Sequence, residues 1–434
     1  MGRFYIRTFG CQMNESDSER ISGMLGQAGA VRAESPEEAD LIIVNTCAVR
    51  EKSEQKLLSY LGRLASLKSQ RDIRIAVVGC VAQLRGRELL EKSSAVDIVL
   101  GPNNTTELLS LVQEPLTKKY ISTTWREEWP DSPAGVVHRY SRVSGYVAVM
   151  EGCDNFCAYC IVPYARGREK YRPLKSILEE LRDLAQKGYL EAQLLGQNVN
   201  SYRDPETGTS FSDLLREAAA VEGLEWLRFL TSHPKNFGPE IADAMAQTRK
   251  VCRQLHLPLQ SGSTAVLERM NRGYTREQYL DIVSRLRRLM PGICLSTDII
   301  VGFPGETERE FEETLEVLRE VRFSNLFSFR YSPRPLTAAS KLKDSVPKKE
   351  KQRRLEEVQR VQRAIQLEDH SRLVGETMKV LCHGHAQKTP DLFSGRNEGH
   401  QVINFRSTED PTGRFVNVRI TGFGPFSLVG EKAS

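Results

Sequence analysis

Short apolar runs alternate with amphipathic stretches over roughly the first quarter of the chain. The runs suit buried strands, and the stretches between them have helical spacing. This alternation predicts an open, parallel α/β domain. The expected strands cover residues 4–9, 41–44, 75–78 and 98–100.

A second alternation of strands and helices follows in the middle of the chain. Its strands are expected at residues 146–150, 192–195, 227–230, 254–259, 293–301 and 326–331. Six strands that alternate with helices predict a partial (β/α)6 barrel. Two of its helices should begin at capping boxes, formed by Thr275 with Gln278 and by Thr307 with Glu310.

The last part of the chain has a different texture. Residues 341–372 hold ten basic and six acidic side chains, with Val358, Val361 and Ile365 at helical spacing, which predicts a basic amphipathic helix that bridges two domains. After Gly375, short alternating runs broken by glycines predict a small antiparallel β-barrel. Its expected strands are 378–381, 401–405 and 414–420.

These patterns divide the chain into three domains and a linker. Residues 1–116 form the N-terminal α/β domain, residues 139–370 form the partial barrel with its basic helix, and residues 371–434 form the C-terminal β-barrel. Residues 117–138 are expected to be a linker, because their composition is that of a loop. The residues that indicate this are Pro130, Asp131, Ser132, Pro133 and Gly135.

Composition narrows the class of protein. The chain has 434 residues, of which 40% are hydrophobic and 27% charged, a balance that excludes collagen-like and wholly disordered proteins. Its net charge of +5 permits a polyanionic partner without requiring one. No apolar run approaches the roughly 20 residues of a membrane span. The first residues resemble a strand rather than a signal peptide, so we expect a cytoplasmic protein without membrane contact.

Nine cysteines in a cytoplasmic chain indicate metal ligands or core residues rather than disulfides. Cys153, Cys157 and Cys160 have C-x3-C-x2-C spacing directly after the first expected barrel strand. Three thiolates on one short loop can hold three corners of an iron–sulfur cube and leave the fourth iron open. The alternatives are a zinc site, which needs a fourth close ligand, or ordinary core cysteines.

A second set of cysteines is spread along the N-terminal domain. Cys11, Cys47 and Cys80 each lie just past the carboxyl end of an expected strand. In an open parallel sheet these ends meet at one crevice, so the three side chains could ligate one metal centre. Each cysteine alone could be a small buried hydrophobe, but three at equivalent positions favour the shared site.

The other cysteines and histidines are expected to be structural. Cys252, Cys294 and Cys382 share no spacing with either set. His256 stands between leucines, as a hydrogen-bonded core histidine would. His383 and His385 are expected in a solvated loop rather than at a zinc site.

Candidate binding residues follow the later barrel strands, where barrel enzymes build their active sites. They are Gln197 with Asn198, Ser232 with His233, Gln260 with Ser261, and Gly302 with Pro304. From these we predict Gln197, Ser232, Gln260 and Gly302 as residues that bind a cofactor or a substrate.

The cysteine loop and the glycine-rich segment from Val301 to Thr307 resemble the radical S-adenosylmethionine enzymes. The three upstream cysteines narrow the resemblance to the methylthiotransferases. Gln12-Met13-Asn14 after Cys11 is similar to the branch that modifies N6-dimethylallyladenosine in tRNA. Relatives that modify a ribosomal protein typically have Pro-Lys-Asn there, and those that modify threonylcarbamoyladenosine have Lys-Val-Asn. Further matching segments are residues 45–52, 151–153, 161–167, 195–200, 231–234 and 256–262.

The resemblance implies a transferase that adds a methylthio group to C2 of N6-dimethylallyladenosine at position 37 of tRNA. It implies two 4Fe–4S clusters and S-adenosyl-L-methionine, with two molecules of the latter used per reaction. Cys153, Cys157 and Cys160 would hold the cluster that binds S-adenosylmethionine. Cys11, Cys47 and Cys80 would hold the auxiliary cluster that provides the sulfur. Beyond the cluster ligands, no catalytic residue is implied.

The resemblance also implies partners. The C-terminal barrel is similar to the TRAM domain, an RNA-binding module, so the partner would be a tRNA anticodon stem-loop. A flavodoxin or ferredoxin would supply electrons, the sulfur donor is left open, and the protein would be a monomer. Two alternatives remain: a methylthiotransferase from one of the other two branches, or a non-catalytic iron–sulfur RNA-binding protein. One departure from the family is at Leu336 and Ala338, where a glycine and a proline are usual.

Overall fold

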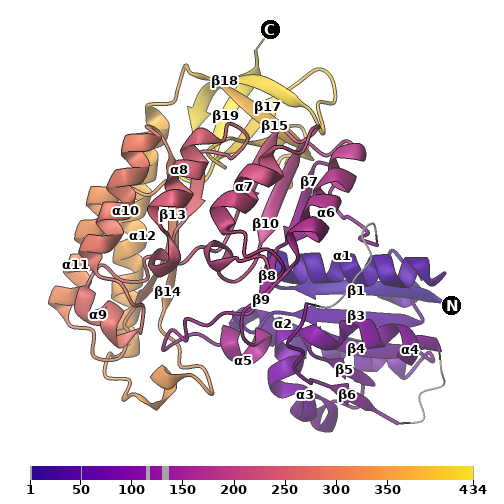
Figure 1. The fold of residues 1–434 in the computed structure, drawn as a ribbon. Helices are drawn as coiled ribbons and strands as arrows, with labels where there is room; N and C mark the ends of the chain where they lie inside the picture. Colours follow the sequence, from indigo (N-terminus) through magenta and orange to yellow (C-terminus); the bar gives the residue numbers. More distant parts are fainter. Residues whose placement is uncertain (1, 50, 114–117, 130–135, 434) are drawn as a thin grey trace.

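The computed structural model describes residues 2–49, 51–113, 118–129 and 136–433. The α/β class and the three units expected from the sequence are present (Figure 1). Pro130, Asp131, Ser132, Pro133 and Gly135, which indicated a linker, lie outside the described residues.

The N-terminal unit is a six-stranded parallel sheet in the order β2-β1-β3-β4-β5-β6. Apolar side chains of α1 and α4 cover one face, and those of α2 and α3 cover the other. The strands are β1 (Arg3–Phe9), β2 (Val31–Arg32), β3 (Leu41–Thr46), β4 (Arg74–Gly79), β5 (Ile98–Leu100) and β6 (Tyr120–Ser122). The helices are α1 (Gln12–Gln27), α2 (Glu51–Lys68), α3 (Cys80–Lys92) and α4 (Leu108–Gln113), with 3-10 turns η1 (Pro36–Glu38) and η2 (Pro102–Glu107).

Strand β6 lies inside the segment that the sequence pattern assigned to a linker. It pairs in parallel with β5, with Ile98 opposite Tyr120 and Leu100 opposite Ser122. Its side chains are only partly buried, so an apolar run did not mark it. The N-terminal sheet therefore extends beyond the expected boundary at residue 116.

The central unit contains two three-stranded parallel sheets, β7-β10-β11 and β12-β13-β14. A single parallel bridge between Leu227 and Val251 lies where the two sheets meet. The strands are β7 (Ser144–Ala148), β10 (Glu191–Leu195), β11 (Trp226–Phe229), β12 (Gln254–His256), β13 (Cys294–Val301) and β14 (Asn325–Arg330). All six expected strands are thus present, although β12 ends at His256 because Pro258 has no backbone donor.

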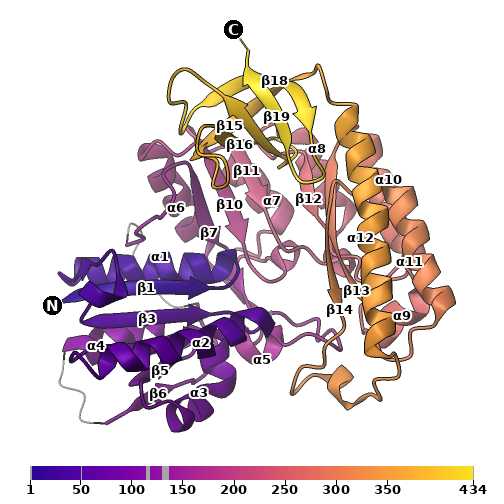
Figure 2. The same cartoon turned by 180° about the vertical axis from the view of Figure 1, so that it is seen from behind.

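Helices cover the outer side of these strands, as Figures 1 and 2 show. They are α6 (Leu174–Gln186), α7 (Phe211–Ala219), α8 (Pro239–Gln247), α9 (Thr264–Arg269), α10 (Arg276–Leu289), α11 (Glu308–Val321) and α12 (Lys348–Ser371). Capping boxes start α10 at Thr275 and α11 at Thr307, as expected. Smaller elements are α5 (Val162–Arg166), the antiparallel pair β8 (Met150–Glu151) and β9 (Lys170–Tyr171), and the 3-10 turns η3 (Val199–Ser201), η4 (Pro234–Asn236) and η5 (Ala338–Lys341).

The basic helix α12 begins at Lys348, seven residues later than the charge pattern indicated. Pro347 precedes it, and a proline favours a helix start because its missing donor is not needed there. Most of its basic side chains form ion pairs, among them Arg353 with Glu308 and Arg360 with Glu357. Much of the charge that suggested an RNA-binding helix is therefore neutralised within the protein.

The C-terminal unit is a closed five-stranded barrel in the order β15-β16-β17-β19-β18. Its strands are β15 (Thr377–His385), β16 (Phe393–Asn397), β17 (Val402–Arg406), β18 (Phe415–Phe423) and β19 (Leu428–Lys432). His383 and His385 are exposed, but they lie in β15 and not in the loop that we expected. The strand continues through them because β16 pairs with it as far as His385.

The C-terminal barrel is anchored to the amino-terminal end of the central sheets. Arg228 of β11 is fully buried and forms an ion pair with Glu191 of β10 at 2.6 Å. The same guanidinium donates to the carbonyl oxygens of Asn397 and Glu398, at 2.8 and 2.7 Å. This contact leaves the opposite, carboxyl-terminal ends of the barrel strands for the candidate site.

Candidate metal centre

The first cysteine set lies on the loop between β8 and α5, at the carboxyl-terminal end of the barrel. Gly152 begins this loop with φ of +85°, and a Cβ there would stand 2.0 Å from the carbonyl oxygen of Arg168. Only glycine fits this close approach. The Gly152 amide donates to Oε1 of Gln197 at 2.6 Å, and the Cys153 amide donates to the Gly167 carbonyl at 3.1 Å.

Two side chains from other parts of the barrel, His233 after β11 and Arg272 between α9 and α10, donate hydrogen bonds to Cys157. Nη1 of Arg272 lies 3.2 Å from its sulfur, and Nε2 of His233 lies 3.6 Å from it. Because Nδ1 of His233 accepts from the Lys235 amide, the proton of a neutral ring is on Nε2. Burial, with Arg272 and Lys235 nearby, lowers the pKa of His233 to about 2, so the ring is neutral.

Burial makes this loop a poor place for free thiolates. It raises the pKa of Cys153 to about 11 and that of Cys160 to about 12. Iron would stabilise the deprotonated form of these sulfurs, as a coordinating metal does for any thiol. The donor set, three sulfurs that point to one region with a cation beside them, therefore suits an iron–sulfur cluster.

The second cysteine set converges as the sequence predicted. β1, β3 and β4 end in register, with Phe9 opposite Thr46 and Thr46 opposite Gly79. Cys11 caps α1, Cys47 follows β3, and Cys80 begins α3. Hydrogen bonds link the Cys47 thiol to the sulfurs of both Cys11 and Cys80. Three residues spread over the domain therefore share one crevice.

In this set Cys47 donates hydrogen bonds to Cys11 and Cys80, and the pKa values of donor and acceptors shift in opposite directions. The hydrogen bond from Cys47 and the nearby guanidinium of Arg166 lower the pKa of Cys11 to about 6 and that of Cys80 to about 7, against the effect of burial. The same hydrogen bonds and burial raise the pKa of Cys47. Two of the three sulfurs are thus favoured as thiolates, the form that binds iron.

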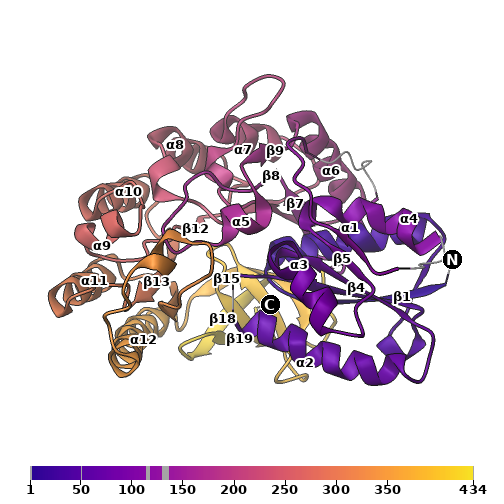
Figure 3. The same ribbon diagram turned by 90° about the horizontal axis from the view of Figure 1, so that it is seen from below.

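Arg166 contacts the second cysteine set from the helix that follows the first set, and the sequence pattern indicated no role for it. It ends α5, the short helix that follows Cys160, and Figure 3 shows α5 beside α3. Its Nε donates to the Cys80 sulfur at 3.3 Å, Nη1 to Glu151 at 2.8 Å and Nη2 to Asp17 at 2.6 Å. Burial would lower the pKa of Arg166, but these anionic neighbours raise it, so the side chain stays charged.

No group of three or more His, Cys, Asp or Glu side chains in the described ranges is arranged around a single metal ion. A 4Fe–4S cluster does not require such an arrangement, because its cysteine ligands bind different iron atoms. Both cysteine sets are therefore compatible with a cluster.

The other predicted site residues also lie at the carboxyl ends of barrel strands. Ser232 and Asn198 are buried, and neither Oγ of Ser232 nor Oδ1 of Asn198 has a hydrogen-bond partner among the residues that the structure describes. Thr231 and Gln260 have left-handed backbones, with φ of 70° and 73°. Strained backbone and unpaired buried polar atoms at one edge are typical of a ligand site.

Gly302 has a different environment from the rest of this group. Its φ is +70°, and a Cβ would stand 2.4 Å from the side chain of Lys351 in α12. Its amide donates to Glu306 at 2.5 Å, and Glu306 pairs with Arg354. The close packing of α12 against this position therefore accounts for a glycine at residue 302.

The residues expected to be structural have the following environments. Cys252 and Cys382 are buried, and Cys294 is partly buried. His256 is only half-buried: it lies 3.0 Å from the Ser296 hydroxyl and 3.4 Å from an oxygen of Asp298, on the inner face of the barrel. Leu336 has φ of +74°, which explains why the family has glycine there.

Comparison with known proteins agrees with this architecture. Residues 3–101 match the uncharacterized protein family UPF0004, residues 147–318 the radical SAM superfamily, and residues 371–433 the TRAM domain. The solved structure of the radical S-adenosylmethionine methyltransferase TsrM from Kitasatospora setae superimposes with a TM-score of 0.59 at 18% identity, over 78% of this chain and 76% of that one. The fold and these matches define a radical S-adenosylmethionine enzyme.

Two curated relatives extend over the full length. The tRNA-2-methylthio-N(6)-dimethylallyladenosine synthase of Clostridium novyi is 44% identical over 99% of this chain and 96% of its own. The synthase of the same name from Geobacter metallireducens is 46% identical over 99% of this chain and 98% of its own. The chain belongs to the family of tRNA-2-methylthio-N(6)-dimethylallyladenosine synthases.

This membership confirms several predictions made from the sequence. The protein is a transferase of the radical S-adenosylmethionine class, and its family uses S-adenosyl-L-methionine and 4Fe–4S clusters. None of the helices in the described ranges is both long and apolar enough to cross a membrane. The domain boundaries and the individual ligands stay predictions.

Proposed function

We propose that this enzyme adds a methylthio group to C2 of N6-dimethylallyladenosine at position 37 of tRNA. The observation that carries the proposal is the pair of separate cysteine sets, one in each domain; Arg166, from the helix after the first set, contacts Cys80 of the second. Cys153, Cys157 and Cys160 would hold one 4Fe–4S cluster, and the set of Cys11, Cys47 and Cys80 would hold the other. Electron-carrier clusters and structural zinc sites normally have four protein ligands, so two sets of three cysteines favour neither kind of protein.

When bound, the first cluster supplies an electron to S-adenosyl-L-methionine, and the second supplies the sulfur of the methylthio group. Arg272 and His233 orient Cys157, and Arg272 places a positive charge beside an anionic site. Oγ of Ser232 and Oδ1 of Asn198, both buried without partners, are available to bind polar groups of S-adenosylmethionine. Gln197 is already committed to the Gly152 amide, so its role is to fix the cysteine loop.

Apolar residues exclude water beside the first cysteine set. They form one buried cluster from the cysteine loop, α9 and the ends of the later strands: Ala158, Val266, Met270, Phe303, Tyr331 and Ala339. The Ala158 amide donates to the Met270 carbonyl at 2.8 Å, which fixes the loop against α9. A dry, rigid surround protects reactive chemistry from solvent.

The family and the TRAM match support tRNA as the substrate. A tRNA substrate implies a cytoplasmic enzyme, and we propose that it acts as a monomer that receives electrons from a flavodoxin or ferredoxin. Gln12-Met13-Asn14 after Cys11 supports the dimethylallyl branch. Asn14 is buried there and bonds Asn45 at 3.0 Å, so this signature shapes the crevice itself.

Cysteine variants test the cluster assignment. Replacing Cys153, Cys157 and Cys160 by Ala should halve iron and sulfide after anaerobic reconstitution and abolish cleavage of S-adenosylmethionine. Replacing Cys11, Cys47 and Cys80 should also halve iron but leave cleavage measurable and stop methylthio transfer. Cys294→Ala, a cysteine outside both sets, is the control and should change neither. Formation of 5′-deoxyadenosine by the first triple variant would refute the assignment.

Substrate choice is tested with the reconstituted full chain. It should modify a stem-loop that carries N6-dimethylallyladenosine and leave a threonylcarbamoyl stem-loop and ribosomal protein largely unmodified. Mass spectrometry of nucleosides and peptides gives the result. Equal turnover of the threonylcarbamoyl stem-loop would place the enzyme in another branch.

A further inference from the structure

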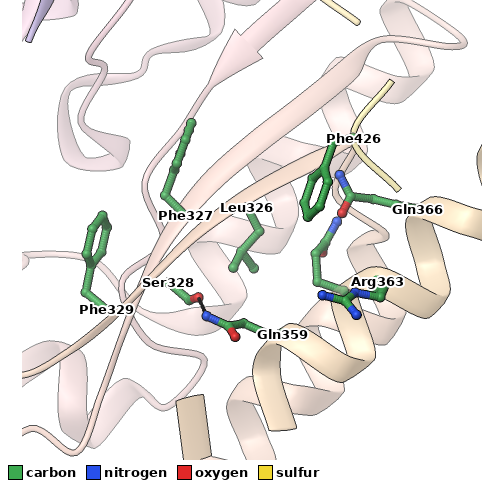
Figure 4. A pocket seen from close by; sticks show the side chains of 9 residues that line it. Leu326, Phe327, Ser328, Phe329, Gln359, Arg363, Gln366 and Phe426 are labelled. Carbon is green, nitrogen blue, oxygen red and sulfur yellow. Dashed lines mark hydrogen bonds between the residues drawn. The ribbon is translucent and has the colours of Figure 1, made fainter. Parts of the chain in front are cut away.

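A groove of about 440 Å³ lies between β14, α12 and the turn that joins β18 to β19. It is separate from both cysteine sets. β14 is the last strand of its sheet, so one edge of its backbone is unpaired in the described fold. Figure 4 shows Phe327 and Phe329 on one side of β14, whereas Phe426 lies toward α12.

Three aromatic rings of this groove are unusually exposed for large apolar side chains. Phe327 is 44% exposed, Phe329 40% and Phe426 73%. Phe426 comes from the C-terminal barrel, and Phe327 contacts His256 edge-to-face on the inner side of the central barrel. The exposed rings therefore extend from the TRAM unit toward the interior of the barrel, where the candidate site lies. Phe327 and Phe329 lie on one side of β14 and Phe426 on the other (Figure 4), and exposed aromatic rings of this kind mark an interaction surface.

The polar side chains of the groove come from α12. Arg363 is one of the α12 cations for which no ion pair is found in the described ranges, although most of its neighbours are paired. Gln362 is 4% exposed and lines the groove; its Nε2 donates to the Phe323 carbonyl at 2.7 Å, and its buried Oε1 has no partner in the described chain. Gln359 bonds Ser328 only weakly, at 3.3 Å. These groups can donate to and accept from a ligand.

This combination fits unstacked nucleobases better than a lipid or a polypeptide. Flat apolar rings stack on the faces of bases, glutamine amides bond their edges, and arginine binds phosphate or stacks. A lipid surface would not need a buried amide acceptor. A peptide that extends the sheet along β14 is the other candidate, but it would not account for the unpaired cation.

We propose that the groove of β14, α12 and Phe426 binds one or more unstacked loop nucleotides of the RNA substrate. The inference rests on the proposed function, since it assumes an RNA substrate. Contact here would hold the RNA between the TRAM unit and the mouth of the barrel. The basic helix thus contributes through Arg363 and its glutamines rather than through its overall charge.

Three single variants of the full, reconstituted chain test the groove. Phe426→Ala and Phe329→Ala should each weaken binding of a dimethylallyladenosine stem-loop about 5- to 150-fold, the range for loss of one base stack. Arg363→Gln should weaken binding and reduce the slope of log K against log salt by about 1, whereas the Phe variants leave that slope unchanged. Leu289→Ala removes a similarly exposed side chain from α10 and is the matched control.

Two further measurements separate the possible failures. Cleavage of S-adenosylmethionine without RNA should be the same in all variants, which shows that the clusters are intact. A stem-loop with photoreactive 4-thiouridine in its loop should crosslink the wild-type chain at β14 or at residues 424–427. Unchanged RNA affinity in the Phe variants, or crosslinks only at other sites, would overturn the proposal that this groove binds RNA. The groove would then bind a peptide or have no ligand. Failure of the wild type to modify any stem-loop would instead refute the proposed function.

Discussion

Replacing Arg166 by Met tests whether one buried cation stabilises the contact of α5 with the N-terminal domain and the thiolate of Cys80. The side chain is 3% exposed and pairs with Asp17 and Glu151 at 2.6 and 2.8 Å. Methionine keeps most of the volume and removes the charge. Asp17 then loses its ion-pair partner, and Glu151 keeps only Lys170, at 3.5 Å.

Removal of one partner from a buried ion pair costs about 3–5 kcal/mol, because the remaining charge is buried and unpaired. At about 2–4 °C per kcal/mol, the apparent Tm should fall by about 6–20 °C. Arg216→Met is the control, since Arg216 is 44% exposed and pairs with Asp213 on the surface. Surface pairs contribute about 0–1 kcal/mol, so its Tm should change little.

A second measurement, the rate of alkylation of Cys80, would not change if Arg166 had a purely structural role. In the apo-protein, the Arg166 guanidinium helps to hold the pKa of Cys80 at about 7. Loss of the charge should raise that pKa and slow alkylation of Cys80 at pH 7, measured by peptide mass spectrometry, while Cys382 is unaffected. Equal Tm losses in Arg166→Met and Arg216→Met, with unchanged alkylation of Cys80, would refute this reasoning.

Three further predictions follow from single contacts. Gly152→Ala should lower iron content by about half and abolish cleavage of S-adenosylmethionine, because its Cβ would meet a carbonyl oxygen at 2.0 Å; Gly188→Ala, with φ of +82° but no neighbour, is the control. Burial would raise the pKa of Glu191, but Arg228 lowers it to about 2. Its stabilising contribution is therefore present above pH 4.5 and lost as the pH falls toward 2, and Glu191→Gln should flatten the Tm profile over that interval. Thr275→Ala should cost about 0.5–2 kcal/mol in denaturant unfolding, whereas Thr275→Ser should cost much less.

Part of the candidate site could be predicted from the sequence, because it depends on the spacing of neighbouring residues or on the order of the strands. Cys153, Cys157 and Cys160 are close in sequence, so their spacing alone placed them on one loop. Cys11 and Cys80 were found differently, since strands that run in parallel bring their carboxyl ends to one edge. Both inferences needed only the order of the elements, and the structure places the side chains accordingly.

Contacts between segments that are distant in the sequence could not be predicted in this way. Arg166 looked like any arginine in a short helix, and its contact with Cys80 spans 86 residues. Arg272 reaches Cys157 across 115 residues. The unpaired Ser232 hydroxyl became informative only once its surroundings were known.

The sequence alone determined the order of strands and helices, the two cysteine sets and the family, because periodicity, capping and motif spacing are properties of neighbouring residues. The tertiary structure decided which charges are buried and paired. It paired Arg353 and Arg354 of α12 with Glu308 and Glu306, which are distant in the sequence, and it placed Arg228 of the central barrel against carbonyl groups of the C-terminal barrel. Side-chain partners depend on how whole elements pack, and a buried charge must find its counter-charge wherever the fold brings one.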